Sequence, residues 1–204
     1  VGPTDVVVEV GPGLGSLTLA LLETAGAVVC IEVDPVLAAR LPQTVAEFAP
    51  EHAHKLKVVC ADALTVTELP LAPDRLVANL PYNISSPLLF HLATISEHVL
   101  DQHFMLQKEV VERMVAEPGS KVYGRLSVML QWRYHMELLF VVPPEAFDPP
   151  PKVDSAIVRM IPRKDVPLCD GTALEEVVTK AFTQRRKVIR NCLSGMFTEE
   201  ELLQ

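Results

Sequence analysis

Short apolar runs rich in β-branched residues alternate with longer amphipathic stretches along the first hundred residues. Strands separated by helices pair in parallel through right-handed crossovers, so this alternation predicts a doubly wound α/β fold with helices on both faces of the sheet. The predicted strands cover residues 5–10, 27–33, 57–61 and 75–79, and the predicted helices cover residues 16–24, 35–48 and 86–96.

The second half of the chain continues the sheet and then becomes helical. Strands at 103–106, 137–142 and 155–161 would complete a mostly parallel sheet of seven strands, with helices at 108–115 and 125–133. Pro149 to Pro151 cannot join a central ladder and predict a rigid surface turn that carries Phe147. Further helices are predicted at 172–182 and 186–193. We therefore expect a sheet domain over residues 1–162 and the start of a small helical domain over residues 163–204.

The net charge of −8 is unevenly distributed along the chain. Residues 1–100 hold 11 acidic and 4 basic residues, whereas the remaining 104 hold 15 acidic and 14 basic residues. Residues 177–196 hold five basic residues and no acidic residue. A run of basic residues in a helix is usually a solvated face, but a phosphate-binding surface needs a local cluster of this kind. The candidate residues for such a nucleic-acid-binding surface are Lys152, Arg185, Arg186, Lys187 and Arg190.

The sequence also indicates where the protein works. No apolar run approaches the roughly 18 residues of a membrane span, so we expect no membrane insertion. The four cysteines are far apart, and the histidines show no ligand spacing, which argues against a disulfide framework or a metal site. A reducing cytoplasm is the expected location.

A glycine-rich turn is predicted between the first strand and the first helix. It reads Glu9-Val10-Gly11-Pro12-Gly13-Leu14-Gly15. Glycines at alternate positions allow a tight turn and leave room for a ligand against the backbone. Because Ser16 stands where a dinucleotide-binding loop would have its third glycine, the loop favours an adenosyl ligand without a pyrophosphate. An ordinary strand-to-helix turn is the alternative.

Carboxylates follow the next two predicted strands. Glu32, beside Val33, lies where it could accept both hydrogen bonds from a ribose diol. Asp62 could accept from an adenine amino group while the backbone of Ala63 donates to the ring. We assign Asp34, which precedes a proline, to capping the next helix. Three strand ends in order predict a ligand crevice at the carboxyl edge of the sheet.

The fourth predicted strand ends in Asn79-Leu80-Pro81-Tyr82, the most specific segment of the chain. An aromatic amine is a weak nucleophile, so an enzyme that alkylates it must hold it with hydrogen-bond acceptors. The Asn79 side chain supplies one acceptor, and Pro81 restricts Leu80 so that the Leu80 carbonyl can supply another. Tyr82 offers a ring on which a base can stack. An Asx-Pro turn with a packed tyrosine is the alternative.

Eight blocks of the sequence resemble those of the bacterial small-subunit ribosomal RNA adenine dimethyltransferases. They are E-V-G-P-G-L-G, I-E-V-D, A-D-A-L, N-L-P-Y-N-I-S-S-P-L-L-F, M-L-Q-K-E-V-V-E-R, Y-G-R-L-S-V, F-D-P-P-P-K-V-D-S-A and F-T-Q-R-R-K-V-I-R-N. The resemblance implies a Rossmann-like class I methyltransferase that uses S-adenosyl-L-methionine and releases S-adenosyl-L-homocysteine. It also implies dimethylation of two adjacent adenines in a hairpin loop of the immature small subunit.

The resemblance implies site residues as well. Glu9, Gly11, Gly13, Gly15, Glu32, Val33, Asp62, Ala63 and Asn79 would bind the cofactor, and Asn79, Leu80, Pro81, Tyr82 and Phe147 would form the catalytic set. Phe147 would stack on the flipped-out base opposite Tyr82. We expect a monomer that uses no metal.

Two readings of function remain as alternatives. One is a large-subunit ribosomal RNA methyltransferase of the erythromycin-resistance type; the other is a non-catalytic assembly or transcription factor that keeps the fold. The family's Gln-x-Phe-Leu stretch before the first strand is not in this sequence, and the helical domain stops at Gln204. We therefore expect weaker cofactor binding and slower turnover than in an intact relative.

Overall fold

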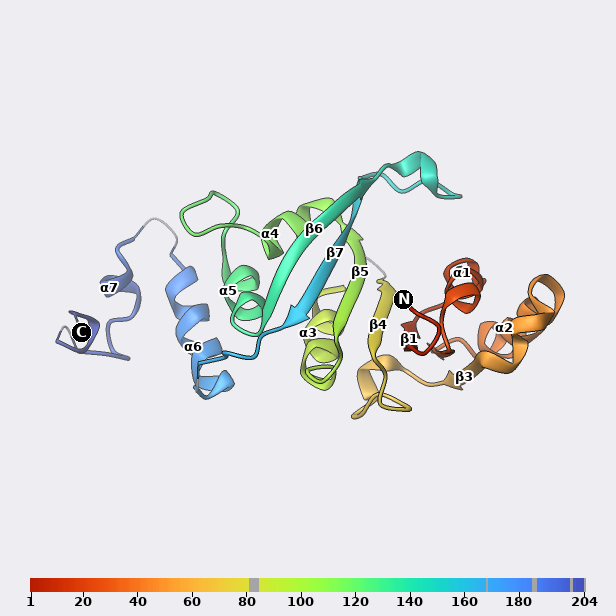
Figure 1. Cartoon of the computed structure of the whole chain (residues 1–204). Helices are drawn as coiled ribbons and strands as arrows, with labels where there is room; N and C mark the ends of the chain where they lie inside the picture. The colour runs from red at the N-terminus through yellow and green to blue at the C-terminus, as the bar shows by residue number, and fades with distance from the viewer. Residues whose placement is uncertain (81–84, 168, 185–186, 199, 204) are drawn as a thin grey trace.

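Seven strands form one sheet in the computed structural model, which describes residues 1–80, 85–167, 169–184, 187–198 and 200–203. The strand order is β3-β2-β1-β4-β5-β7-β6. β1 to β5 are parallel, and β7 runs antiparallel to both β5 and β6. Their bounds are β1 Val6–Val10, β2 Ala27–Glu32, β3 Leu56–Cys60, β4 Arg75–Asn79, β5 Asp101–Gln107, β6 Tyr134–Val142 and β7 Ser155–Pro162. The predicted mostly parallel, doubly wound sheet is confirmed (Figure 1).

Helices cover both faces of this sheet. They are α1 Ser16–Thr24, α2 Pro35–Phe48, α3 Ser85–Ile95, α4 Lys108–Met114, α5 Arg125–Gln131, α6 Gly171–Phe182 and α7 Ile189–Cys192, with 3₁₀ turns η1 Pro50–Lys55, η2 Ala63–Thr65, η3 Pro144–Ala146 and η4 Glu201–Leu203. None of the helices described in the structure is long and apolar enough to cross a membrane.

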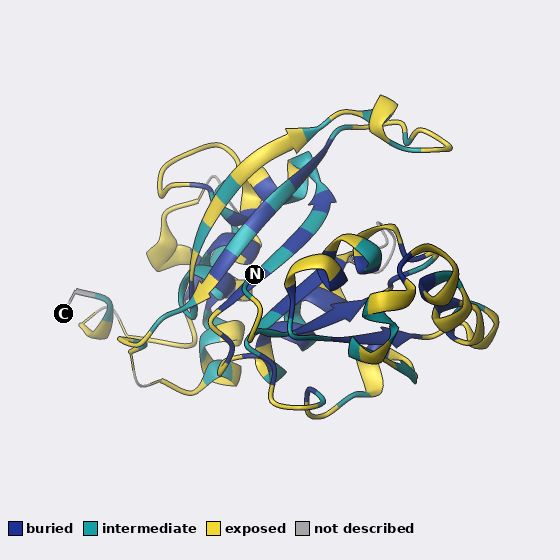
Figure 2. Cartoon of the chain, turned by 45° about the vertical axis from the view of Figure 1, so that its right-hand side comes forward, coloured by how far each residue is buried: buried dark blue, intermediate teal, exposed yellow. Residues whose placement is uncertain are grey.

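Strand alternation divides the core into two apolar clusters. Val8 and Val10 of β1 point to the face covered by α3, α4 and α5, whereas Val7 packs with leucines of α1 and α2 on the other face. Buried residues run along the middle of the sheet, and the outer helix surfaces are exposed (Figure 2). Glu9 faces the same side as Val7, so the strand pleat directs this carboxylate towards α1.

β6 and β7 form a long antiparallel arm that extends beyond the other strands and carries η3 at its tip (Figures 1 and 2). β6 begins at Tyr134, three residues earlier than its predicted start. The Tyr134 ring is 1% exposed, and its hydroxyl donates to the carbonyl of Ala93 on α3. This tertiary contact fixes the start of the strand.

The segment after β7 contacts α5 and the residue that follows it. Arg125 of α5 forms an ion pair with Glu175 of α6, and Trp132 Nε1 donates to the carbonyl of Pro167 at 3.4 Å. The predicted helix at 186–193 is shorter in the described residues, where α7 covers only Ile189–Cys192.

Candidate active site

The carboxyl ends of β1, β2, β3 and β4 lie side by side at one edge of the sheet and open into two cavities. The smaller, about 80 Å³, is lined by residues that include Gly11, Glu32, Val33, Asp62, Ala63 and Leu80. The larger, about 740 Å³, is lined by residues that include Glu9, Gly11, Gly13, Asn79, His103 and Phe147. Gly11 borders both cavities, so one ligand bound along the glycine loop can reach from the first into the second.

The glycine loop adopts a backbone that other residues would strain. Gly11, Gly13 and Gly15 have φ values of +72°, +56° and +91°. A Cβ atom on Gly13 would meet no atom within 4 Å, whereas a Cβ on Gly15 would lie 2.7 Å from Leu41 Cδ1. Gly13 therefore leaves free space on its cavity side, and Gly15 allows α1 to pack closely on α2.

Glu32 holds the glycine loop against the end of β2. Its side chain is 5% exposed; Oε2 accepts from the Gly13 N–H at 3.2 Å, and Oε1 accepts from the Asp34 N–H at 3.0 Å. Each carboxylate oxygen keeps a second lone pair. Glu32 can therefore accept two more hydrogen bonds in the smaller cavity, as a ribose diol requires.

Glu9 is the second buried carboxylate of the site, at 2% exposure. Its Oε2 accepts from Thr18 Oγ1 at 2.6 Å and from Cys30 Sγ at 3.5 Å. Burial raises the pKa of Glu9, although these hydrogen bonds oppose the rise. A cation in the larger cavity would favour the ionised form of this carboxylate.

The end of β3 forms the far wall of the smaller cavity. Asp62 caps η2, where its Oδ1 accepts from the Leu64 N–H at 2.9 Å, and Ala63 is buried. Asp34 caps α2 by accepting from the Val36 and Leu37 N–H groups at 2.7 and 3.3 Å, so its predicted capping role is confirmed.

Asn79 lies at the end of β4 with an exposed side chain, whereas Leu80 is 1% exposed and donates its N–H to the Met105 carbonyl at 3.1 Å. Asn79 and Phe147 line the same large cavity, the latter from the arm. Pro81 and Tyr82, also expected here, lie outside the described residues.

Charge limits what these two cavities can bind. Two carboxylates, Glu9 and Glu32, face the glycine loop, and among the described residues no lysine or arginine lines either cavity. A pyrophosphate would be repelled here, whereas a sulfonium or ammonium group would be attracted. The charge of these side chains therefore fits S-adenosylmethionine, which carries a sulfonium and an ammonium group. The predicted preference for an adenosyl ligand over a dinucleotide has a physical basis.

Some lining residues were not expected from the sequence. His103, Met105, Ile157 and Phe140 lie on the same face of the sheet as Asn79, because the register pairs Asn79 with Met105, Met105 with Ile157, and Ile157 with Phe140. Burial lowers the pKa of His103 despite the nearby Asp101 carboxylate. The strand alternation signals which residues share a face, but only the strand order shows that these four strands are neighbours.

The predicted RNA-binding residues that the structure describes lie in two separate places. Lys152 is exposed in the loop between η3 and β7, whereas Lys187 and Arg190 are exposed next to and within α7, which lies away from the arm (Figure 1). Arg185 and Arg186 lie outside the described residues. In the part of the chain that the structure describes, no group of three histidine, cysteine or carboxylate side chains could hold a metal ion.

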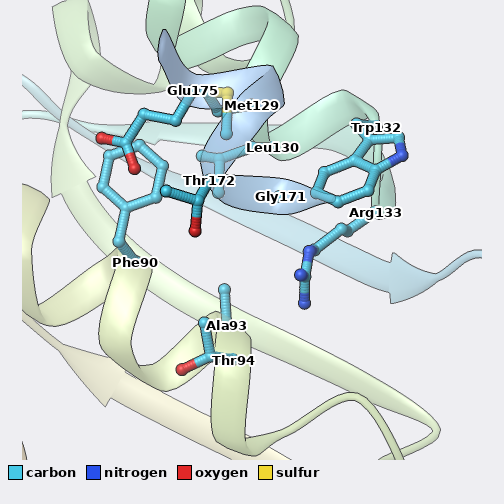
Figure 3. A pocket seen from close by; sticks show the side chains of 10 residues that line it. All are labelled: Phe90, Ala93, Thr94, Met129, Leu130, Trp132, Arg133, Gly171, Thr172 and Glu175. Atoms are coloured by element: carbon cyan, nitrogen blue, oxygen red, sulfur yellow. The ribbon is translucent and has the colours of Figure 1, made fainter. Parts of the chain in front are cut away.

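A separate cavity of about 430 Å³ lies between α3, α5 and α6 (Figure 3). Arg133 lies 4.7 Å from the Trp132 ring centre and forms an ion pair with Glu97. Phe90 and Leu130 contribute apolar walls. None of the four strand ends contributes to this cavity, so it is not the candidate active site.

Comparison with known proteins agrees with this geometry. The family model described as "Ribosomal RNA adenine dimethylase" matches residues 1–204. A relative from Herminiimonas arsenicoxydans, named "Ribosomal RNA small subunit methyltransferase A", is 61% identical over 99% of this chain and 79% of its own length. A relative of the same name from Laribacter hongkongensis is 54% identical over 98% of this chain and 76% of its own.

Two solved structures are also similar. A dimethyladenosine transferase from Plasmodium falciparum has a TM-score of 0.84 and 31% identity, covering 95% of this chain and 68% of its own. The 23S rRNA methyltransferase ErmE has a TM-score of 0.78 and 29% identity, covering 98% of this chain and 79% of its own. The chain therefore belongs to the ribosomal RNA adenine dimethylase family.

Proposed function

We propose that this protein is an S-adenosylmethionine-dependent dimethyltransferase acting on the N6 amines of two adjacent adenines in small-subunit ribosomal RNA. The observation that carries the proposal is that Asn79, the glycine loop and Glu9 line the same cavity. Relatives that carry the small-subunit name support the RNA class.

The cofactor would extend along the glycine loop. When bound, S-adenosylmethionine supplies an electrophilic methyl group on a sulfonium and leaves as S-adenosylhomocysteine. Glu32 would accept from the ribose hydroxyls, and Asp62 and Ala63 would bind the adenine ring in the smaller cavity. Val33 supports the same wall. Glu9 would balance the positive charge in the larger cavity.

The chain's own acceptors would prepare the target amine. The Asn79 side-chain oxygen and the Leu80 carbonyl would each accept one N6–H, which leaves the nitrogen lone pair free to form the new N–C bond. Phe147 would stack on the flipped-out base. Once methylated, the nitrogen is acidic and releases its proton to water, so holding the two reactants in line supplies most of the rate.

The remaining parts of the proposal concern the biological context. We assign residues 1–162 to catalysis and residues 163–204, with Lys187 and Arg190, to RNA binding, together with Lys152 near the arm. The substrate would be an immature small subunit late in assembly, and the protein would act as a monomer in the cytoplasm.

One experiment separates this function from its nearest alternative. The similarity to a 23S rRNA methyltransferase makes large-subunit RNA the alternative substrate. Immature small subunits and large subunits are supplied separately with methyl-labelled cofactor, and the modified nucleotides are mapped. Label on adenine N6 of the small-subunit RNA supports the proposal, and label confined to large-subunit RNA contradicts it.

Replacing the proposed amine acceptor tests the mechanism. Asn79→Ala is expected to lower kcat on the order of 100-fold or more, because one preorganised hydrogen-bond partner of the reacting group is lost. RNA binding should persist. Gln43→Ala, which removes an exposed amide on α2, is the matched control and should leave kcat unchanged. An Asn79→Ala enzyme with normal kcat would favour a different target site.

A further inference from the structure

Two sequence blocks typical of the family meet beside the larger cavity, which is proposed to hold the target adenine and is called the target cavity. They are residues 105–113 and 147–156. Both contribute to a third cavity of about 430 Å³, whose lining includes Gln107, Lys108, Glu109, Lys152 and Asp154. The Lys108 N–H donates to the Asp154 carbonyl at 2.9 Å, which holds the two blocks together.

This third cavity adjoins the target cavity on two sides. Pro144 lines the third cavity, and its carbonyl accepts from the N–H of Phe147, which lines the target cavity, at 3.1 Å. On the strand side, Met105 pairs with Asn79, and Gln107 lies two residues further along β5, roughly 7 Å away. A nucleotide next to the target adenine would therefore reach the third cavity.

The polar groups of the third cavity are not all used within the protein. Lys108 Nζ lies 3.9 Å from Glu112 and 3.8 Å from Asp154, so these three charges are paired. Gln107 is the N-cap of α4, yet its half-buried side chain makes no capping hydrogen bond. Among the described residues, neither Glu109 nor Lys152 has an ion-pair partner within 4 Å. An amide, a carboxylate and a cation remain available.

We propose that this cavity is a flanking-base subsite that holds the nucleotide beside the target adenine and selects adenine there. The inference rests on the proposed function. An amide such as Gln107 presents a donor and an acceptor in one plane, which matches the amine and the ring nitrogen on an adenine edge. Glu109 adds a second acceptor for the amine of this flanking adenine, and Lys152 contacts the phosphate of the same nucleotide. Guanine presents a carbonyl at the position of that amine and would face the Glu109 carboxylate.

The test measures methyl transfer to one fixed adenine. Immature small subunits are reconstituted with adenine or guanine at the neighbouring position, and label at the fixed adenine is mapped and converted to kcat/KM. The wild-type protein should prefer the adenine neighbour on the order of tenfold. Gln107→Ala should reduce that preference to within about twofold, mainly by slowing the reaction beside adenine, whereas Gln43→Ala should retain it.

The outcomes distinguish the subsite from the reaction itself. Absence of methyl transfer to every subunit would overturn the proposed function and the subsite with it. Methyl transfer with equal kcat/KM for both neighbours, or with the full preference kept by Gln107→Ala, would overturn the subsite alone. A thermal melt and a cofactor affinity like those of the wild type establish that the Gln107→Ala protein is folded.

Discussion

Glu9 and Glu32 are both buried carboxylates beside the glycine loop, but the protein uses them differently. Glu32 accepts from two backbone N–H groups, which fixes the loop before any ligand arrives. Among the described residues, Glu9 accepts hydrogen bonds from the side chains of Thr18 and Cys30, and burial raises its pKa. Its ionisation should therefore respond to a bound cation.

Cofactor affinity should consequently depend on pH through Glu9. Because burial raises the folded-state pKa of Glu9 above the ordinary value of 4.5, the Glu9 anion is lost as the pH falls through the raised pKa. We expect calorimetry to show that S-adenosylmethionine binds more weakly as the pH is lowered through this range. Glu9→Gln should bind S-adenosylmethionine on the order of tenfold more weakly than the wild type at a pH above that raised pKa, with little pH dependence. Identical pH profiles for both proteins would remove Glu9 from the cofactor site.

At the residue scale, the sequence predicts local roles better than shared surfaces. The capping role of Asp34 follows from the Asp34-Pro35 pair before a predicted helix and is confirmed. The position of His103 in the large cavity depends instead on the β4–β5 pairing and the face on which Asn79 lies. Contacts of this kind require the tertiary arrangement.

At the scale of elements, the turn from β1 to α1 combines a packing role and a binding role in different glycines. Gly15 lies against Leu41, a residue that is 1% exposed, whereas Gly13 faces open space. Substitutions at the two positions should therefore have different consequences.

Gly15→Ala should lower the free energy of unfolding by about 2 kcal/mol, because the new methyl meets Leu41 and φ is +91°. Gly13→Ala should cost only about 1 kcal/mol from its left-handed backbone, but should weaken cofactor binding because its methyl enters the cavity. Urea unfolding and calorimetry measure the two effects. A larger stability loss for Gly13→Ala than for Gly15→Ala would contradict this division.

Element boundaries were predictable where local chemistry sets them. Ser16–Thr24 and Pro35–Phe48 match their predicted bounds because a glycine turn and an Asp-Pro cap mark their starts. The early start of β6 depends on Tyr134 contacting α3, and the start of α7 at Ile189 was also missed. Neither could be read from periodicity.

At the scale of the whole molecule, an ionic cluster ties the sheet together at the end opposite the cavities. Arg75 of β4 bonds Asp5 at 2.8 Å and Asp101 of β5 at 2.5 Å, and Arg159 of β7 bonds Asp101 at 3.1 Å. Burial acts to raise the pKa of Asp101, but the bond from Arg75 and the nearby positive charges lower it overall.

Asp101→Asn should lower the free energy of unfolding by about 3 kcal/mol at neutral pH, because two arginines lose their shared carboxylate. A lowered pKa means that this stabilisation is fully present above the ordinary value of 3.8 and is lost as the pH falls through the folded-state value. The difference from wild type should shrink accordingly in acid. Asp165→Asn, at an exposed pair with Arg163, is the control and should change little. Equal stability of the Asp101→Asn and wild-type proteins at neutral pH would contradict the role of the cluster.

The strand alternation alone predicts the fold class, but it does not specify the strand order. The placement of β7 between β5 and β6 brings the arm, and with it Phe147, over the end of β4. The family resemblance implied only that Phe147 would stack on the target base, and the residues themselves carry no local signal for the strand order.

The central claim is that the ends of β1 to β4 place the cofactor beside Asn79. A crystal structure of the protein with S-adenosylhomocysteine tests it most directly. We predict ribose hydroxyls bonded to Glu32 and the sulfur in the cavity that Asn79 and Phe147 line. A ligand bound instead between α3, α5 and α6, or with its sulfur directed away from Asn79, would contradict the account.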